Sequence, residues 1–280
     1  MNTSLRGGML ALTLGTLTAG LPGAAAGEIE LLGYSFDSSG SLWTLDQDTG
    51  AASGGVVTGE ELIFGIAADA DNSLYGLVGR LGPLANHLVR INPTTGALSD
   101  IGHTGMDVFE GDLAFDPTTG DLYGIQHGPA DLALYLFRID KTTAQGTIVG
   151  ALNPTRAADF SAMAFDTDGN LYVLDTQNER LLHVDESNAA ILSSVPTGVP
   201  LGAGAGMAFH PATGALFVAD GLADGTDTLY HADVETGNLT PIGSIGLNDG
   251  VQALTFIPEP SAAWIIAVGG ALLLRPPRRT

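Results

Sequence analysis

The chain has 280 residues, of which 31 are acidic and 10 are basic, so its formal charge at neutral pH is −21. It contains 39 glycines and no cysteine, which suits one loop-rich β domain and excludes a disulfide-stabilised scaffold. A surface this acidic also excludes nucleic acid as a partner, because phosphate backbones are bound through Lys and Arg.

The amino terminus has the pattern of a secretory signal peptide. Arg6 supplies the positive charge, residues 9–21 form an apolar stretch, and Ala24-Ala25-Ala26 is a small-residue cleavage site. The apolar stretch is shorter than the roughly 20 residues of a spanning helix, which favours a cleaved signal over a membrane anchor. We therefore expect residues 1–26 to be removed on export.

Residues 27–257 contain two short sequence motifs, which we call phrases, that recur at intervals of 44 to 50 residues. The first phrase is Leu42-Trp-Thr-Leu-Asp46, Leu88-Val-Arg-Ile-Asn92, Leu136-Phe-Arg-Ile-Asp140, Leu181-Leu-His-Val-Asp185 and Leu229-Tyr-His-Ala-Asp233. The second is Ile66-Ala-Ala68, Leu113-Ala-Phe115, Met163-Ala-Phe165, Met207-Ala-Phe209 and Leu254-Thr-Phe256. A fixed order of two phrases at this period indicates a repeat architecture.

Each repeat reads as four short strands joined by polar or Gly-rich turns. In the clearest repeat we expect strands at residues 162–165, 171–174, 181–184 and 191–195. Four-stranded units of this length predict an all-β protein, a β-propeller. The first strand alternates small and large side chains, as expected where strands converge on a narrow axis.

The count of phrases predicts five blades. The first repeat lacks its inner strand, and the last repeat supplies only that strand, at residues 251–256. Pairing this strand with residues 31–36 would complete one blade and close the ring without exposed sheet edges.

The turns of the expected propeller divide between its two faces. Turns of the Asp-Pro-Thr-Thr-Gly120 kind repeat closely on one face, where Asp opens the turn and Gly closes it. Connections on the other face vary in length and content. Because irregular loops on a rigid scaffold usually carry ligands, we expect the binding site on the variable face.

Several acidic residues stand shortly before the inner strands, and these are the candidate metal ligands. They are Glu61, Glu110, Asp112, Asp159 and Asp249. If they gather at the mouth of the channel, their mutual repulsion would recruit a hard cation, with calcium the best match to oxygen ligands. The alternative is that these acids cap turns and face water.

Other patterns point to structure more than to chemistry. Asp166-Thr-Asp-Gly-Asn170 resembles a calcium loop but lacks its final Glu, so we interpret it as an Asx-type hairpin. His183 and His231 occupy equivalent places in two repeats and are expected to be strand residues. No catalytic residue is predicted.

The carboxyl terminus carries the most specific motif. Pro258-Glu259-Pro260 precedes an apolar run at residues 261–274, which is followed by Arg275, Arg278 and Arg279. This order resembles the PEP-CTERM signal of proteins exported by Gram-negative bacteria. As a helix the run would reach only about 21 Å, against a hydrocarbon core of about 30 Å, so it suits transient inner-membrane association.

The resemblance implies processing by an exosortase and a location at the cell surface or outside the cell. The expected domains are a signal peptide (1–26), a propeller (27–257) and a sorting tail (258–280). For the propeller we expect a non-catalytic binding protein, with extracellular polysaccharide or matrix as its partner. The alternative is a hydrolase or lactonase of the propeller type that depends on a divalent ion.

Overall fold

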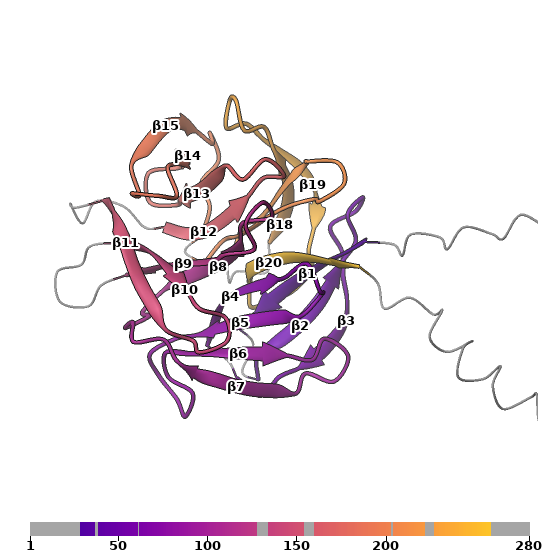
Figure 1. Ribbon diagram of the computed structural model, residues 1–280. Helices are drawn as coiled ribbons and strands as arrows, with labels where there is room; N and C mark the ends of the chain where they lie inside the picture. The colour runs from indigo at the N-terminus through magenta and orange to yellow at the C-terminus, as the bar shows by residue number, and fades with distance from the viewer. Residues whose placement is uncertain are drawn as a thin grey trace, which may run out of the picture.

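The computed structural model describes residues 29–36, 39–60, 62–127, 134–153, 160–202, 204–221 and 227–258. They form five antiparallel sheets of four strands each, arranged around a central axis, so the protein is a five-bladed β-propeller (Figure 1). The predicted fold is confirmed. Within these residues no helix is long and apolar enough to cross a membrane.

Four blades are each made from one continuous stretch of chain, and their strands run outward from the axis in sequence order. Blade 2 contains β4 (Ile63–Ala68), β5 (Leu74–Val78), β6 (His87–Ile91) and β7 (Leu98–His103). Blade 3 contains β8 (Gly111–Phe115), β9 (Leu122–His127), β10 (Leu134–Ile139) and β11 (Gly146–Asn153). Blade 4 contains β12 (Phe160–Phe165), β13 (Leu171–Asp175), β14 (Arg180–Val184) and β15 (Ile191–Pro196). Blade 5 contains β16 (Gly206–Phe209), β17 (Leu216–Ala219), β18 (Thr228–Ala232) and β19 (Leu239–Ser244).

Blade 1 joins the two ends of the domain, as the sequence predicts. Its strand order is β20 (Val251–Pro258), β1 (Ile29–Ser35), β2 (Ser41–Leu45) and β3 (Ala52–Val57). The register pairs Ile29 with Pro258 and Leu31 with Phe256. The strand β20 thus extends through Pro258, the first residue of the tail motif, and the described chain begins and ends side by side in this blade (Figure 1).

The hydrophobic core consists of five clusters, one between each pair of neighbouring blades. Small residues on one side of each inner strand face large residues of the next blade. Two inner strands approach closely at Gly65, where a Cβ atom would lie 2.4 Å from the backbone nitrogen of Leu113. Only glycine fits there, because real Cβ atoms do not come that near to backbone.

Turns of the same design occupy one face of the ring, which we name the hairpin face. It carries the turn between the third and fourth strands of every blade and, in blades 2 to 5, the turn between the first and second strands. In the turn after β2, Asp46 accepts the amide hydrogens of Asp48 and Thr49, at 3.0 and 2.8 Å. Asn92, Asp140 and Asp233 act in the same way. The opposite face, with the variable connections, is named the loop face.

Candidate functional site

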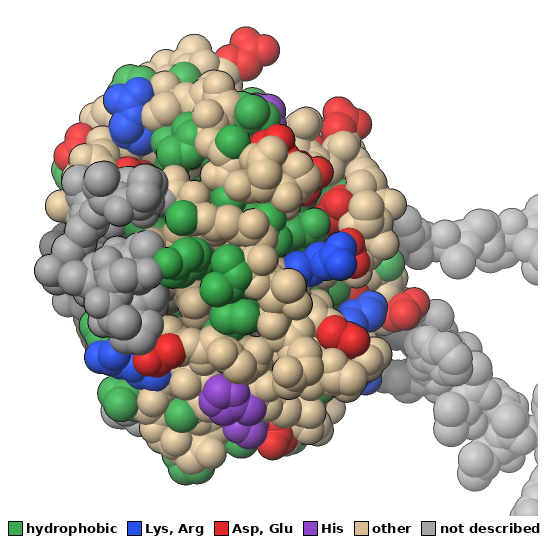
Figure 2. Space-filling view, turned by 60° about the vertical axis from the view of Figure 1, so that its left-hand side comes forward, with side chains coloured by type: hydrophobic (Ala, Val, Ile, Leu, Met, Phe, Trp, Pro, Cys, Tyr) green, Lys and Arg blue, Asp and Glu red, His purple; other side chains and the backbone are tan. Residues whose placement is uncertain are grey.

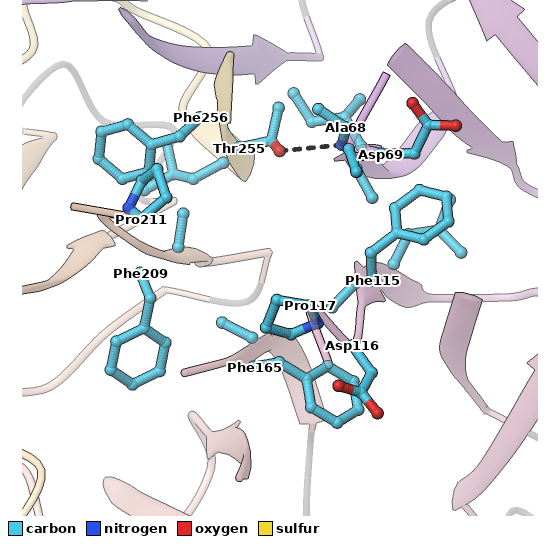
Figure 3. A pocket seen from close by; sticks show the side chains of 18 of the residues that line it. Ala68, Asp69, Phe115, Asp116, Pro117, Phe165, Phe209, Pro211, Thr255 and Phe256 are labelled. Carbon is cyan, nitrogen blue, oxygen red and sulfur yellow. Dashed lines mark hydrogen bonds between the residues drawn. The ribbon is translucent and has the colours of Figure 1, made fainter. Parts of the chain in front are cut away.

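The channel at the centre of the ring opens as a pocket on the hairpin face. Its walls are the carboxyl ends of the five inner strands β4, β8, β12, β16 and β20, together with the turns that follow them. The cavity volume is about 380 Å³. Figure 3 shows the side chains around this opening, which come from all five blades.

The deeper part of the pocket is apolar because every blade contributes one large aliphatic side chain to it. These side chains are buried, and they are Ile66, Leu113, Met163, Met207 and Leu254. A group entering the pocket therefore leaves water for an apolar floor, which favours ligands with an apolar part.

Nearer the mouth, blades 1, 3, 4 and 5 place a phenylalanine at the end of the inner strand, whereas blade 2 places Ala68 there. The phenylalanines are Phe115, Phe165, Phe209 and Phe256. In Figure 3 their rings turn away from the middle of the opening, toward the neighbouring blades. They thus line the pocket with their edges and stems and complete the packing between blades.

Each of these rings contacts an aromatic residue of the preceding blade. The ring centroids are 5.4 Å apart for Tyr75 and Phe115 and 5.3 Å apart for Tyr123 and Phe165. The corresponding distances are 5.4 Å for Tyr172 and Phe209 and 5.5 Å for Phe217 and Phe256. Such tilted and edge-on pairs stabilise beyond the burial of their surface.

A third residue extends three of these pairs outward on the next strand. Arg90 lies 5.3 Å from the ring centroid of Tyr75, His183 stacks on Tyr172 at 5.2 Å, and His231 contacts Phe217 at 4.3 Å. The prediction that His183 and His231 are equivalent strand residues is confirmed, since both pair with the aromatic residue of the second strand.

Three of the four carboxylates that line the mouth, those of Asp69, Asp116 and Asp166, accept hydrogen bonds within their own turns. The fourth, Asp71, is exposed. Asp116 accepts hydrogen bonds from the hydroxyls of Thr118 and Thr119, both at 2.7 Å. Burial raises the pKa of Asp116, but these threonine hydrogen bonds lower it by more, so the net shift is downward. Asp166 accepts the amide hydrogens of Asp168 and Asn170 at 3.0 and 2.8 Å, which is the Asx-type hairpin that the sequence predicts.

Lys141, the one lysine of the chain, lies at the mouth and reaches from blade 3 to blade 2. Its Nζ donates to Oδ2 of Asp69 at 2.9 Å and lies 5.4 Å from the ring centroid of Phe115. The Asp69 side chain is 5% exposed and that of Lys141 is 37% exposed. Burial raises the pKa of Asp69, yet the hydrogen bond from Lys141 and the backbone amides lower it overall.

Three of the predicted metal ligands, Glu110, Asp112 and Asp249, lie at or just before the start of the inner strands β8 and β20, toward the loop face. In the view of Figure 2, acidic side chains (red) lie in several separate places on the surface. Glu61 and Asp159 fall outside the described residues, so the calcium ring stays a prediction. Glu110 is half-buried and Asp249 is exposed. No group of three or more His, Asp or Glu residues with the geometry to hold a metal occurs within the part of the chain that the structure describes.

Asp112, the fifth candidate, joins two blades. Its side chain is 1% exposed, and Oδ2 accepts the amide hydrogen of Met163 at 2.7 Å while Oδ1 accepts that of Leu113 at 2.8 Å. Burial raises the pKa of Asp112 well above its ordinary value, and these two hydrogen bonds oppose that shift. Oδ2 thus links β8 to β12, while Oδ1 bonds within β8.

The sequence analysis expected the binding site on the loop face, whereas the axial pocket opens on the hairpin face among the regular turns. A sequence signal for this pocket was present in the second recurring phrase, since its last residue is phenylalanine in four repeats and alanine in one.

His87 and His103 also meet across β6 and β7, with ring centroids 5.4 Å apart and His87 bonded to Asp100 at 2.8 Å. Spacing alone did not reveal that pair.

Comparison with known families finds a match to a model described as "Repeat of unknown function (DUF6923)" over residues 112–256, slightly more than half of the chain. The matched segment runs from β8 to β20, through blades 3, 4 and 5. A comparison with curated protein sequences finds no match.

Two solved structures share the propeller fold with this chain. One comes from the crystal structure of a nidogen/laminin complex, with 15% identity and a TM-score of 0.52, covering 82% of this chain and 98% of that one. The other comes from work titled "The de novo evolutionary emergence of a symmetrical protein is shaped by folding constraints". It has 20% identity and a TM-score of 0.52, and the match covers 81% of this chain and 98% of that one. These similarities concern the fold alone.

Proposed function

This chain belongs to the family described as "Repeat of unknown function (DUF6923)", and for this member we propose that the propeller is a non-catalytic binding module. The proposed module is exported across the inner membrane and sorted to the cell surface. Its partner class is an extracellular polysaccharide or matrix component, or a small molecule associated with one.

The observation that carries the binding role is the axial pocket, where three of the four lining carboxylates already accept hydrogen bonds from the protein. A catalytic acid or base must have an oxygen within reach of substrate. At this mouth Asp69, Asp116 and Asp166 direct their oxygens to their own turns or to Lys141. The apolar floor below them offers a place to hold a group, which suits binding better than hydrolysis.

The surface location rests on the tail motif Pro258-Glu259-Pro260 with its apolar run and arginines. The exosortase and the transient association with the inner membrane belong to the same proposal. The position of β20 supports it, because the strand that closes the ring ends at Pro258, the first residue of the motif.

Deleting residues 259–280 tests the sorting proposal. The truncated chain should fold with an unchanged urea midpoint and appear in the medium, because no strand of the propeller is lost. The full chain should accumulate at the cell surface. Equal surface amounts of both proteins would contradict the role of the tail.

The binding role is tested by recovering what the propeller captures. The exported chain is incubated with material released from the surface of the producing cells, and compounds that co-elute are identified by mass spectrometry. They should be recovered chemically unchanged. Hydrolysis of esters or lactones, with or without added calcium, would instead favour the enzyme alternative.

A further inference from the structure

Four of the five junctions between blades share one arrangement near the axis. A phenylalanine from the inner strand of one blade meets an aromatic residue from the second strand of the preceding blade. We name this arrangement the aromatic pair. The four pairs are Tyr75 with Phe115, Tyr123 with Phe165, Tyr172 with Phe209, and Phe217 with Phe256.

The junction between blades 1 and 2 lacks both members of this pair. The strand register places Leu32 at the position of the tyrosines and Ala68 at the position of the phenylalanines. On the third strand, Thr44 stands where other blades have Arg or His. Three positions that carry large planar groups elsewhere thus carry smaller side chains here.

Where the other junctions carry a phenylalanine, this one has only the methyl group of Ala68 on the wall of the pocket. Ala68 and Thr255 both line the cavity, and Figure 3 shows them facing each other across this junction. Thr255 also departs from the repeat, since the other blades have alanine at its position. Its side chain is 8% exposed, and its hydroxyl oxygen accepts the amide hydrogen of Ala68 at 3.2 Å.

Charge around the mouth narrows the class of ligand. The lining includes the carboxylates of Asp69, Asp71, Asp116 and Asp166 and the single cation of Lys141. Lys141 is already paired with Asp69, so its charge is compensated. The remaining carboxylates would repel an anion, whereas a neutral or cationic group enters without that cost.

We propose that the gap at Ala68 holds an aromatic group of a small ligand that carries no net negative charge. The bound ring takes the place that phenylalanine fills at the other four junctions, against Leu32 and beside Thr255. This assignment rests on the proposed binding function and specifies where in the pocket the ligand sits and which chemistry it has.

The test uses the full chain and a neutral fluorescent probe, N-phenylnaphthylamine, titrated by emission intensity. Wild type should bind the probe. Ala68→Phe should weaken binding by about tenfold or more, because a covalent phenyl group then fills the gap. Ala68→Leu should give a smaller loss in the same direction. Ala51→Phe adds the same group to an exposed turn of blade 1 and serves as the matched control.

Folding of each variant is checked by its urea midpoint. Ala68→Phe should keep or raise the midpoint, because it extends the repeat pattern. If it unfolds the ring, Ala68→Leu carries the test instead. Anilinonaphthalene sulfonate, the anionic relative of the probe, should bind wild type about tenfold more weakly than the neutral compound because of the carboxylates.

Unchanged affinity in both Ala68 variants would overturn the assignment, as would preference for the sulfonate. If wild type and Ala68→Phe bind the probe with equal affinity, the position beside Ala68 is not the binding site. The binding function itself would still be supported if the propeller captures a native compound and leaves it unchanged. An equal loss in Ala51→Phe would also contradict the proposal.

Discussion

The junction between blades 1 and 2 differs from the other four in how it closes beside the axis. Aromatic pairs pack the other junctions, whereas Leu32 and Ala68 meet at this one. It also adjoins the blade in which the chain ends come together, so its strands come from distant parts of the sequence. A ring of similar blades therefore has one junction where a pocket can be asymmetric without weakening the other four.

The largest expected effect comes from removing the strand that closes blade 1. Deleting residues 251–258 takes away the partner of β1 and the buried apolar side chains of Val251, Ala253, Leu254 and Ile257. The loss should be about 5 kcal/mol or more, comparable with the whole stability of a domain. The urea midpoint measures it. A change below about 0.5 kcal/mol, the size of an ordinary surface substitution, would contradict closure by this strand.

Phe165→Ala tests an intact aromatic junction. Phe165 is 6% exposed and packs on Tyr123 between blades 3 and 4. Its truncation should lower the free energy of unfolding by about 3–5 kcal/mol, because it leaves a cavity where the blades meet. Ala68→Phe, which adds a phenyl group at the junction of blades 1 and 2, is the opposite change and should not lower the free energy of unfolding. Equal losses of stability in both variants would show that the junction of blades 1 and 2 is packed as tightly as the others.

A smaller effect is expected at the ion pair beside the gap. Lys141→Met should cost about 1 kcal/mol at neutral pH, because the half-exposed lysine is partly screened by water. The folded-state pKa of Asp69 is lowered, so its contribution is present above its ordinary pKa and is lost as the pH falls through the lowered value.

Unfolding of wild type and Lys141→Met is therefore compared in urea at neutral and acidic pH. The difference between the two proteins should shrink in acid. A difference that stays constant across that range would assign the stabilisation to packing of the lysine stem on Phe115 and not to charge.

Much of the fold could be read from the sequence because the repeats are local in design. The phrase Met163-Ala-Phe165 marks an inner strand, and the count of such phrases gives the number of blades. The closing strand was predicted at residues 251–256, and the structure extends it to Pro258. That extension depends on pairing with Ile29, which no local pattern specifies.

The site was less predictable because it depends on contacts between blades. Lys141 and Asp69 are 72 residues apart, and only the ring brings the turn of blade 3 over that of blade 2. The expectation that ligands bind among variable loops directed attention to the loop face. Asp112, chosen there as a metal ligand, has both oxygens bonded to backbone amides, one in its own strand and one in the inner strand of the next blade.

The position of a bound aromatic compound tests the central claim most directly. A crystal structure of the chain soaked with N-phenylnaphthylamine should show one ring of the compound at Ala68, against Leu32 and within reach of the Thr255 hydroxyl. A compound bound on the loop face, or in the pocket away from the junction of blades 1 and 2, would contradict the account.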